Sequence, residues 1–264
     1  TEQTLKGAWR REDRQGYDSE EVRGRLGFAR ALGWNWTGST YYRLKRTVIY
    51  NVDPELALTT PEDAVAGTVG VGLTRDTSDD YFFPRRGTRS GVMLERTGGF
   101  FGGNVHFIKA AWDGALYHPL WGPFVGAVAA RLGVMKPTGP TRDIPVYERF
   151  FTGGANSVRG YRERGVGPTD SLGAPIGGRY IAGARLETRA PLFWRLSAAA
   201  FIDAGQVGDE TRLLRPGLWK SGAGGGLRLR TPVGPLRVDA AYKINPDPGD
   251  RDLWRVHLSV GEAF

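Results

Sequence analysis

The chain has 264 residues, a formal net charge of +8, 39 glycines and no cysteine. The lack of cysteine excludes disulfides and thiolate metal sites, and the three histidines lie far apart in the sequence, so we expect neither a metal ion nor another cofactor. No apolar run approaches the ~20 residues that a membrane-spanning helix needs.

Apolar and polar residues alternate along most of the chain, which is typical of β-strands. The alternating segments exceed the about 5–6 residues of a common sandwich strand and reach the ~9–11 residues that a membrane strand needs. We therefore predict an all-β fold, a transmembrane antiparallel β-barrel in a single domain over residues 1–264. About twelve strands are predicted, near residues 4–13, 20–32, 36–50, 65–77, 88–99, 104–116, 122–136, 177–192, 195–207, 221–232, 235–245 and 253–264.

The second predicted strand illustrates the two faces of such a barrel. Val22, Leu26 and Phe28 share one parity, whereas Arg23 and Arg25 share the other. A membrane barrel turns apolar side chains to lipid and polar ones to its interior, so the arginines are assigned to the lumen. A soluble sandwich also alternates, but an arginine-rich polar face favours the barrel. Because the basic residues form neither a helical stripe nor a tail, we do not expect nucleic acid as a partner.

Two connections differ from the short turns between the other strands. Residues 51–64 predict a short helical turn outside the membrane. Residues 137–176 form about forty residues without a strand period, and loops beyond ~15 residues are uncommon and usually functional. This long loop contains FFTGGANSVRGY at 150–161, in which the glycines allow tight turns and the aromatic residues favour burial.

The arginine of this loop has a candidate partner on a later strand. Asp203 lies among apolar residues in FIDAG at 201–205. A buried charge is tolerated only when it is paired, so we predict that the loop folds into the barrel lumen and is held there by Arg159 and Asp203. Glu187, on the preceding strand with inward parity, is a second candidate acceptor, because a guanidinium fork can engage two carboxylates.

The last predicted strand has the clearest pair of faces. Trp254 and Leu258 lie on its apolar face, which ends in the aromatic Phe264, whereas His257 and Gly261 lie on the polar or small face. Glycine adds no cross-strand side-chain contact, so Gly261 is expected to weaken this strand where it pairs with the first strand at the closure seam of the barrel.

Several motifs occur in one order along the chain. They are RDTSDDYFFPRRG at 75–87, YERFFTGGANSVRGY at 147–161, ETRAPL at 187–192, FIDAG at 201–205 and GPLRVDA at 234–240. Over about residues 65–264 this series resembles the barrel domain of the bacterial surface-antigen superfamily, the BamA/TamA/FhaC type of outer-membrane assembly and secretion barrel. The resemblance implies a location in the bacterial outer membrane.

The resemblance also implies a role for the loop residues. Val158, Arg159, Gly160 and Tyr161 form the motif by which the loop is fixed in the lumen, with a salt bridge from the arginine to the strand carboxylate, here Asp203. We expect a structural lock with consequences for function and no catalytic role. The family's barrels have sixteen strands and carry periplasmic POTRA domains. Either four amino-terminal strands are absent from this chain, or it is a compact variant.

Three functions are compatible with these observations. The first is an assembly and insertion factor, which opens laterally at its seam and thins the local membrane. The second is a translocation pore of the two-partner secretion type, and the third is a passive channel that prefers anions. The partners implied for the first two are outer-membrane lipid, unfolded outer-membrane or secreted client polypeptides, and periplasmic or lipoprotein partners.

Other residues that suggest enzymatic or metal chemistry have simpler interpretations. Asp76, Asp79 and Asp80 depart from the calcium-loop pattern and are expected to form a polar turn. Ser157 and the distant His118 do not form a nucleophile and base pair. We therefore do not expect an enzyme.

Overall fold

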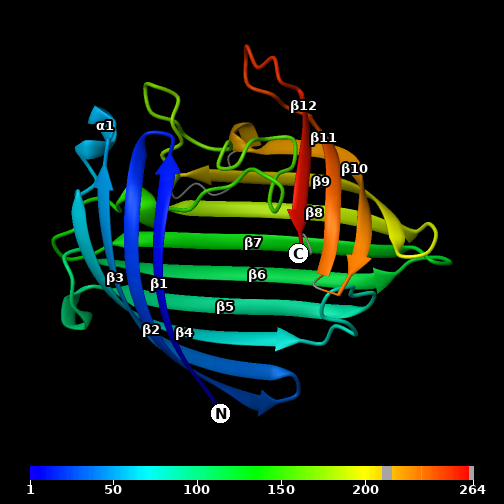
Figure 1. Cartoon of the computed structure of the whole chain (residues 1–264), viewed down its shortest axis with the longest axis horizontal. Coiled ribbons are helices and arrows are strands. Elements are labelled where there is room, and N and C mark those ends of the chain that lie inside the picture. The colour runs from blue at the N-terminus through cyan, green and yellow to red at the C-terminus, as the bar shows by residue number, and fades with distance from the viewer. Residues whose placement is uncertain (210–215, 233, 262–264) are drawn as a thin grey trace.

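The computed structural model describes residues 1–209, 216–232 and 234–261. Within these residues, one antiparallel sheet of twelve strands runs in chain order from β1 to β12 (Figure 1). The strands are β1 (Glu2–Arg14), β2 (Tyr17–Gly33), β3 (Trp36–Tyr50), β4 (Asp63–Asp76), β5 (Gly87–Thr97), β6 (Phe107–Pro119), β7 (Val125–Pro137), β8 (Tyr180–Pro191), β9 (Leu196–Gly208), β10 (Lys220–Thr231), β11 (Gly234–Lys243) and β12 (Trp254–Val260). The predicted antiparallel β-fold and its strands are confirmed, with ends that differ by a few residues.

Helical structure in the described part of the chain is confined to short turns. They are α1 (Pro54–Ala57), η1 (Gly99–Phe101), η2 (Val146–Glu148) and η3 (Pro216–Leu218). The first of these is the helical turn predicted within residues 51–64. None of the helices described is long and apolar enough to cross a membrane.

Cross-strand pairing places the apolar residues of neighbouring strands on the outer face. In the β1–β2 pair, Leu5 lies opposite Leu26 and Trp9 opposite Val22, and all four side chains are exposed. A two-residue turn joins β2 to β3, and its residues Trp34 and Asn35 adopt φ values of 52° and 63°. Two positive φ values match the twist of a β-hairpin, and a register shift between Ala31 and Gly33 lies next to the turn.

The two edge strands do not pair with each other. Within the described residues, β1 pairs only with β2 and β12 only with β11, and a gap separates their edges in Figure 1. Pairing between the first and last strands is therefore not found among residues 1–209, 216–232 and 234–261.

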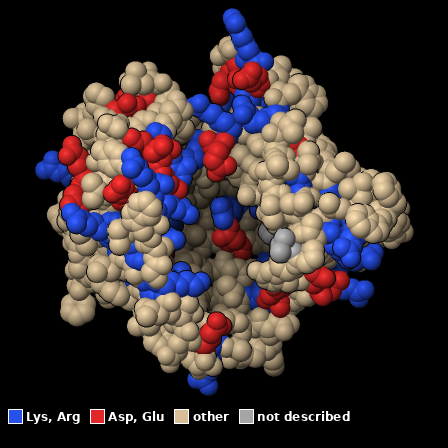
Figure 2. Space-filling model, in the orientation of Figure 1, with Lys and Arg blue, Asp and Glu red and all other residues tan. Residues whose placement is uncertain are grey.

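The gap opens onto a charged interior. Figure 2, in the same orientation, shows the molecule hollowed between the two edges, with acidic and basic side chains inside the hollow. Edge residues also lack one neighbour each: Leu5 is 82% exposed and Leu258 is 78% exposed, whereas Leu186, on a strand paired on both sides, is 49% exposed. The fold therefore has an apolar outer belt, with β1 and β12 at the two ends of the described sheet.

The long connection between β7 and β8 folds into the interior, as predicted. Ile144 is buried against Ala64, Phe107 and Met135, on three different strands. Val146 is buried in a second apolar cluster with Tyr17, Ile49 and Leu56. The first part of the loop thus packs on the strands of the amino-terminal half, and Figure 1 shows the rest of it crossing inside the curved sheet.

Burial of the loop tip predicts a difference in chemical reactivity. Val158 is 1% exposed, whereas Thr169, in the same loop, is exposed. Because the protein has no cysteine, single Val158→Cys and Thr169→Cys variants carry one thiol each. We expect a maleimide coupled to polyethylene glycol to label Thr169→Cys rapidly and Val158→Cys slowly in detergent micelles, with equal rates after denaturation. Equal rates in the folded protein would contradict the buried tip.

Candidate functional site

The tip of the long loop is shaped by glycines that adopt positive φ values. Gly153, Gly154 and Gly160 have φ of 107°, 102° and 98°, a region that other residues rarely enter. The resulting turn buries Val158 and Tyr161 against each other and against Val166. This small apolar cluster holds the loop backbone on both sides of Arg159. The side chain of Arg159 therefore points to the strands.

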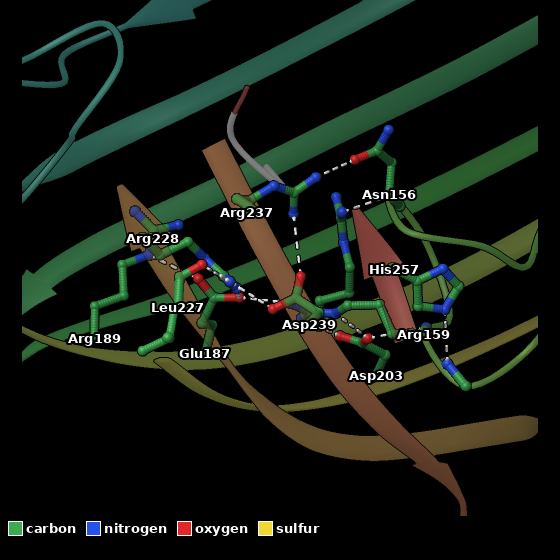
Figure 3. Close-up of polar contacts among 12 residues, drawn as sticks. Asn156, Arg159, Glu187, Arg189, Asp203, Leu227, Arg228, Arg237, Asp239 and His257 are labelled. Atoms are coloured by element: carbon green, nitrogen blue, oxygen red, sulfur yellow. Dashed lines mark hydrogen bonds and ion pairs between the residues drawn. The ribbon is translucent and has the colours of Figure 1, made fainter. Parts of the chain in front are cut away.

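Arg159 is completely buried and is paired with two carboxylates (Figure 3). Its Nε and Nη2 donate to Asp203 Oδ2 and Oδ1 at 2.7 and 2.8 Å, a two-pronged contact. Its Nη1 donates to Glu187 Oε2 at 2.8 Å, and its backbone N–H donates to Asp203 Oδ2 at 3.1 Å. The structure thus brings together the three charged residues that the sequence singled out.

The surroundings of Arg159 favour its charged form. Its guanidinium carbon lies 3.4 Å from the centre of the Phe201 ring, which covers one face of the group. Burial opposes the charge of Arg159, but the hydrogen bonds and charges of Asp203 and Glu187 outweigh burial and raise its pKa above the ordinary arginine value. Arg159 therefore stays a cation and remains bound to both acids.

Sequence reasoning missed three further members of this network. Asp239 on β11 lies 3.5 Å from Arg159 and accepts a hydrogen bond from Arg228 on β10. Arg228 also donates to Glu187 at 3.1 Å. Arg237, completely buried, lies 3.9 Å from Asp239 and donates to the loop residue Asn156. The inward parity of Arg237 and Asp239 in GPLRVDA was the available signal, but it does not say which inward charges meet.

The remaining motif residues attach the loop to the last strands. The backbone N–H of Gly160 donates to His257 Nε2 on β12 at 3.3 Å, and the hydroxyl of Tyr161 donates to the carbonyl of Asn245 at 3.0 Å. A Cβ added to Gly222 on β10 would lie 2.0 Å from the carbonyl oxygen of Arg159. Gly222 is therefore the residue that lets the loop backbone lie against β10.

A second charged contact holds the beginning of the loop, residues 144–149, which we call the root. Glu148 forms a 2.5 Å ion pair with Lys45 on β3, and both side chains are buried. Lys45 also lies 3.6 Å from Glu21 on β2. The adjacent Arg149 donates to the carbonyl of Ile144 at 2.7 Å, which closes the root on itself. The loop is thus anchored to β3 at its root and to β8–β12 at its tip, across the lumen.

The other predicted residues have structural surroundings or lie outside the described chain. Gly261 follows β12 with φ of 93°, and its N–H donates to the carbonyl of Pro235 at 2.8 Å. Phe264 lies outside the described residues. Asp79 and Asp80 accept backbone N–H groups of the β4–β5 loop, as expected of a polar turn. In the part of the chain that the structure describes, no group of three or more possible metal ligands is found.

Removal of the Arg159 side chain is expected to destabilise the fold strongly. In Arg159→Ala, Asp203 and Glu187 would remain buried without their shared cation, and breaking a buried pair costs about 3–5 kcal/mol. Arg159→Lys keeps the charge but loses the fork, so it should restore only part of the loss. The temperature at which the folded form disappears in heat-modifiable gel mobility measures both effects.

Arg162→Ala is a matched control for this experiment. Arg162 is an exposed arginine of the same loop with one hydrogen bond, to the carbonyl of Gly173 at 3.1 Å. Its removal should change stability by no more than about 0.5 kcal/mol. If Arg159→Ala and Arg162→Ala unfold at the same temperature, the lock does not stabilise the protein.

Gly222→Ala tests the contact between the loop and β10 without changing a charge. The added methyl meets a backbone oxygen that cannot rotate away, so the loop must shift, at a cost of about 1–3 kcal/mol. Gly183→Ala on β8 meets only the carbonyl oxygen of Ala204, at the ordinary contact distance of 3.6 Å, and should be nearly neutral. Comparable unfolding temperatures for the two variants would refute the close approach.

The comparisons with known proteins agree with this fold and motif order. The Omp85 superfamily domain profile matches residues 4–264. The outer membrane protein assembly factor BamA of Nitratidesulfovibrio vulgaris is 31% identical over 252 residues, covering 90% of this chain and 31% of that protein. BamA of Neisseria meningitidis serogroup B is 28% identical over 231 residues, covering 75% of this chain and 28% of that protein.

Among solved structures, BamA from Haemophilus ducreyi lacking POTRA domains 1–3 aligns with a TM-score of 0.72 at 19% identity, over 93% of this chain and 53% of that chain. The chain thus spans about a third of the curated BamA relatives and about half of the solved one. The predicted resemblance and the outer-membrane location are confirmed. The chain belongs to the Omp85 superfamily of outer-membrane β-barrel proteins.

Proposed function

We propose that this chain is the membrane-embedded part of an outer-membrane protein assembly factor, which inserts client β-barrels without covalent chemistry. The observation that carries the proposal is the antiparallel sheet whose interior is held by the loop locked through Arg159, in a chain of the Omp85 superfamily. The assembly factors named among its relatives support the same function.

In this proposal a client strand adds to an edge of the sheet when the barrel opens. An unpaired strand presents a row of backbone N–H and C=O groups, and another strand can add to it by forming the same ladder of hydrogen bonds. On the outer face, Leu5 and Trp9 of β1 and Val256 and Leu258 of β12 are highly exposed, so an added strand with an apolar outer face would cover them.

The strands also differ in length, with 11 residues in β5 and 17 in β2. A sheet with an uneven apolar belt is matched by thinning of the lipid next to its shorter strands. In this proposal the thinner lipid lowers the barrier to inserting a client strand.

The lock keeps the carboxyl-terminal strands in register while the edges are in use. Arg159 joins β8, β9 and β11 through Glu187, Asp203 and Asp239. In this proposal the chain termini and short turns lie at the periplasm. The partners are outer-membrane lipid, unfolded client polypeptides and periplasmic or lipoprotein components, with no nucleic acid.

Site-specific photo-cross-linking in liposomes tests where clients bind. A photoreactive amino acid is placed at Leu258 on the free edge, and a matched one at Leu186, an outward leucine on a strand paired on both sides. A urea-denatured outer-membrane β-barrel is then added as client, and its insertion is followed by heat-modifiable mobility. We expect faster insertion than in empty liposomes and cross-links at Leu258 but not at Leu186.

A third position separates the proposal from the two other functions. Ser90 lines a cavity of about 770 Å³ inside the barrel, beside the loop tip. Cross-links at Ser90 with none at Leu258 would favour a polypeptide translocation pore. Ion flux without any client cross-link would favour a passive channel, and either result overturns the assembly proposal.

A further inference from the structure

A second cavity lies at the end of the sheet that carries the short turns between β4 and β5, β6 and β7, and β8 and β9. It has a volume of about 130 Å³ and is separate from the loop tip. Four guanidinium side chains line it, contributed by the β4–β5 loop, β8 and β10: Arg85, Arg189, Arg228 and Arg230. We call it the arginine pocket.

The charged residues among the described lining of this pocket are all cations. Its other described lining residues are apolar or small, such as Phe83, Pro84 and Val125, and no acidic residue is among them. Part of the charge is balanced behind the wall, where Glu187 binds Arg189 and Arg228. Four cations around one small cavity repel one another, and the repulsion is greatest where water is displaced. An anion in the cavity would remove it.

Arg228 contributes a buried donor that the described protein does not use. The residue is 5% exposed, and its Nη1 and Nη2 atoms bind Asp239 and Glu187. Its Nε has no hydrogen-bond partner among the described residues. A buried N–H without a partner costs about 1–3 kcal/mol, so the two acids do not use the full hydrogen-bonding capacity of Arg228.

Arg230 and Arg85 supply the charge that is free to bind. Neither has a carboxylate within ion-pair distance in the described part of the chain. The guanidinium carbon of Arg230 lies 4.1 Å from the centre of the Phe83 ring, so stacking fixes the plane of the group. A fixed guanidinium plane presents two parallel N–H donors, the geometry that a carboxylate or phosphate group accepts.

We propose that the arginine pocket binds a small oxyanion, a carboxylate or a phosphate group, with its charge on Arg230, Arg85 and Arg228 and any short apolar substituent against Phe83. The anion would also stabilise Arg228, which is shared with the Arg159 network, and so connect occupancy of the pocket to the stability of the lock. The proposal does not depend on the assembly function, because binding is measured without a client.

Isothermal titration calorimetry on the folded protein in detergent tests the site and its source of anion. The probes are inorganic phosphate, N-acetyl-alanine as a peptide-like carboxylate, and N-acetyl-alaninamide, which has the same shape without the charge. All are titrated at fixed ionic strength in chloride. We expect binding of phosphate, of N-acetyl-alanine or of both, and none of the amide. Binding of phosphate alone identifies a site for free phosphate. Binding of N-acetyl-alanine alone identifies a site for a polypeptide carboxylate.

The variants Arg230→Gln and Arg85→Gln should each weaken the binding by about tenfold, the loss expected for one charge-assisted hydrogen bond. Arg195→Gln is the matched control, an exposed arginine at the neighbouring β8–β9 turn that stacks on Trp194 and does not line the pocket. Unchanged gel mobility shows that each variant is folded. Absence of binding, equal binding of the amide, or equal loss in Arg195→Gln would overturn the proposal.

Discussion

A guanidinium without access to water must be surrounded by acceptors, and the structure depends on how this requirement is met for Arg159. Two carboxylates bind it directly and a third lies close by, each from a different strand. The position of the loop, the register of three strands and the small residue at Gly222 are all fixed by this one group. The glycine turns and the apolar cluster at the loop tip serve to deliver the arginine to the place where those strands meet.

The lock also explains why so many charges can lie inside the barrel. Charged residues with inward parity cannot be left singly in a desolvated interior, because each would carry the full cost of losing water. Here the cations of β10 and β11 share the same acids that bind the loop, so that the strand network and the loop stabilise each other. Removing the loop would leave Asp203 without the arginine that binds both of its oxygens.

The strands and the contacts of Arg159 could be predicted from the sequence. Alternation assigns residues to the two faces of a strand, and a buried loop arginine requires inward-facing acids as partners. Alternation identified all twelve strands, and the inward position of Glu187 and Asp203 next to an isolated loop arginine indicated the lock. The pairing of Lys45 with Glu148 could not be predicted, since it depends on where a long loop crosses the lumen. The lack of pairing between β1 and β12 in the described residues was not predicted either, because alternation reports the faces of a strand and not the number of its neighbours.

The two charged contacts of the loop, at its root and at its tip, differ in which charges lose a partner when the contact breaks. Lys45 has Glu21 as a second acid beside it, so the root contact can open without exposing a lone buried cation. Arg159 leaves three acids on the strands it quits, and no other described loop residue makes its contacts with them. Ile144 and Val146 are fully buried beside this contact, so the root also packs on the strands of the amino-terminal half. The long connection therefore joins the two halves of the sheet across the lumen, mainly by apolar packing at its root and by charge at its tip.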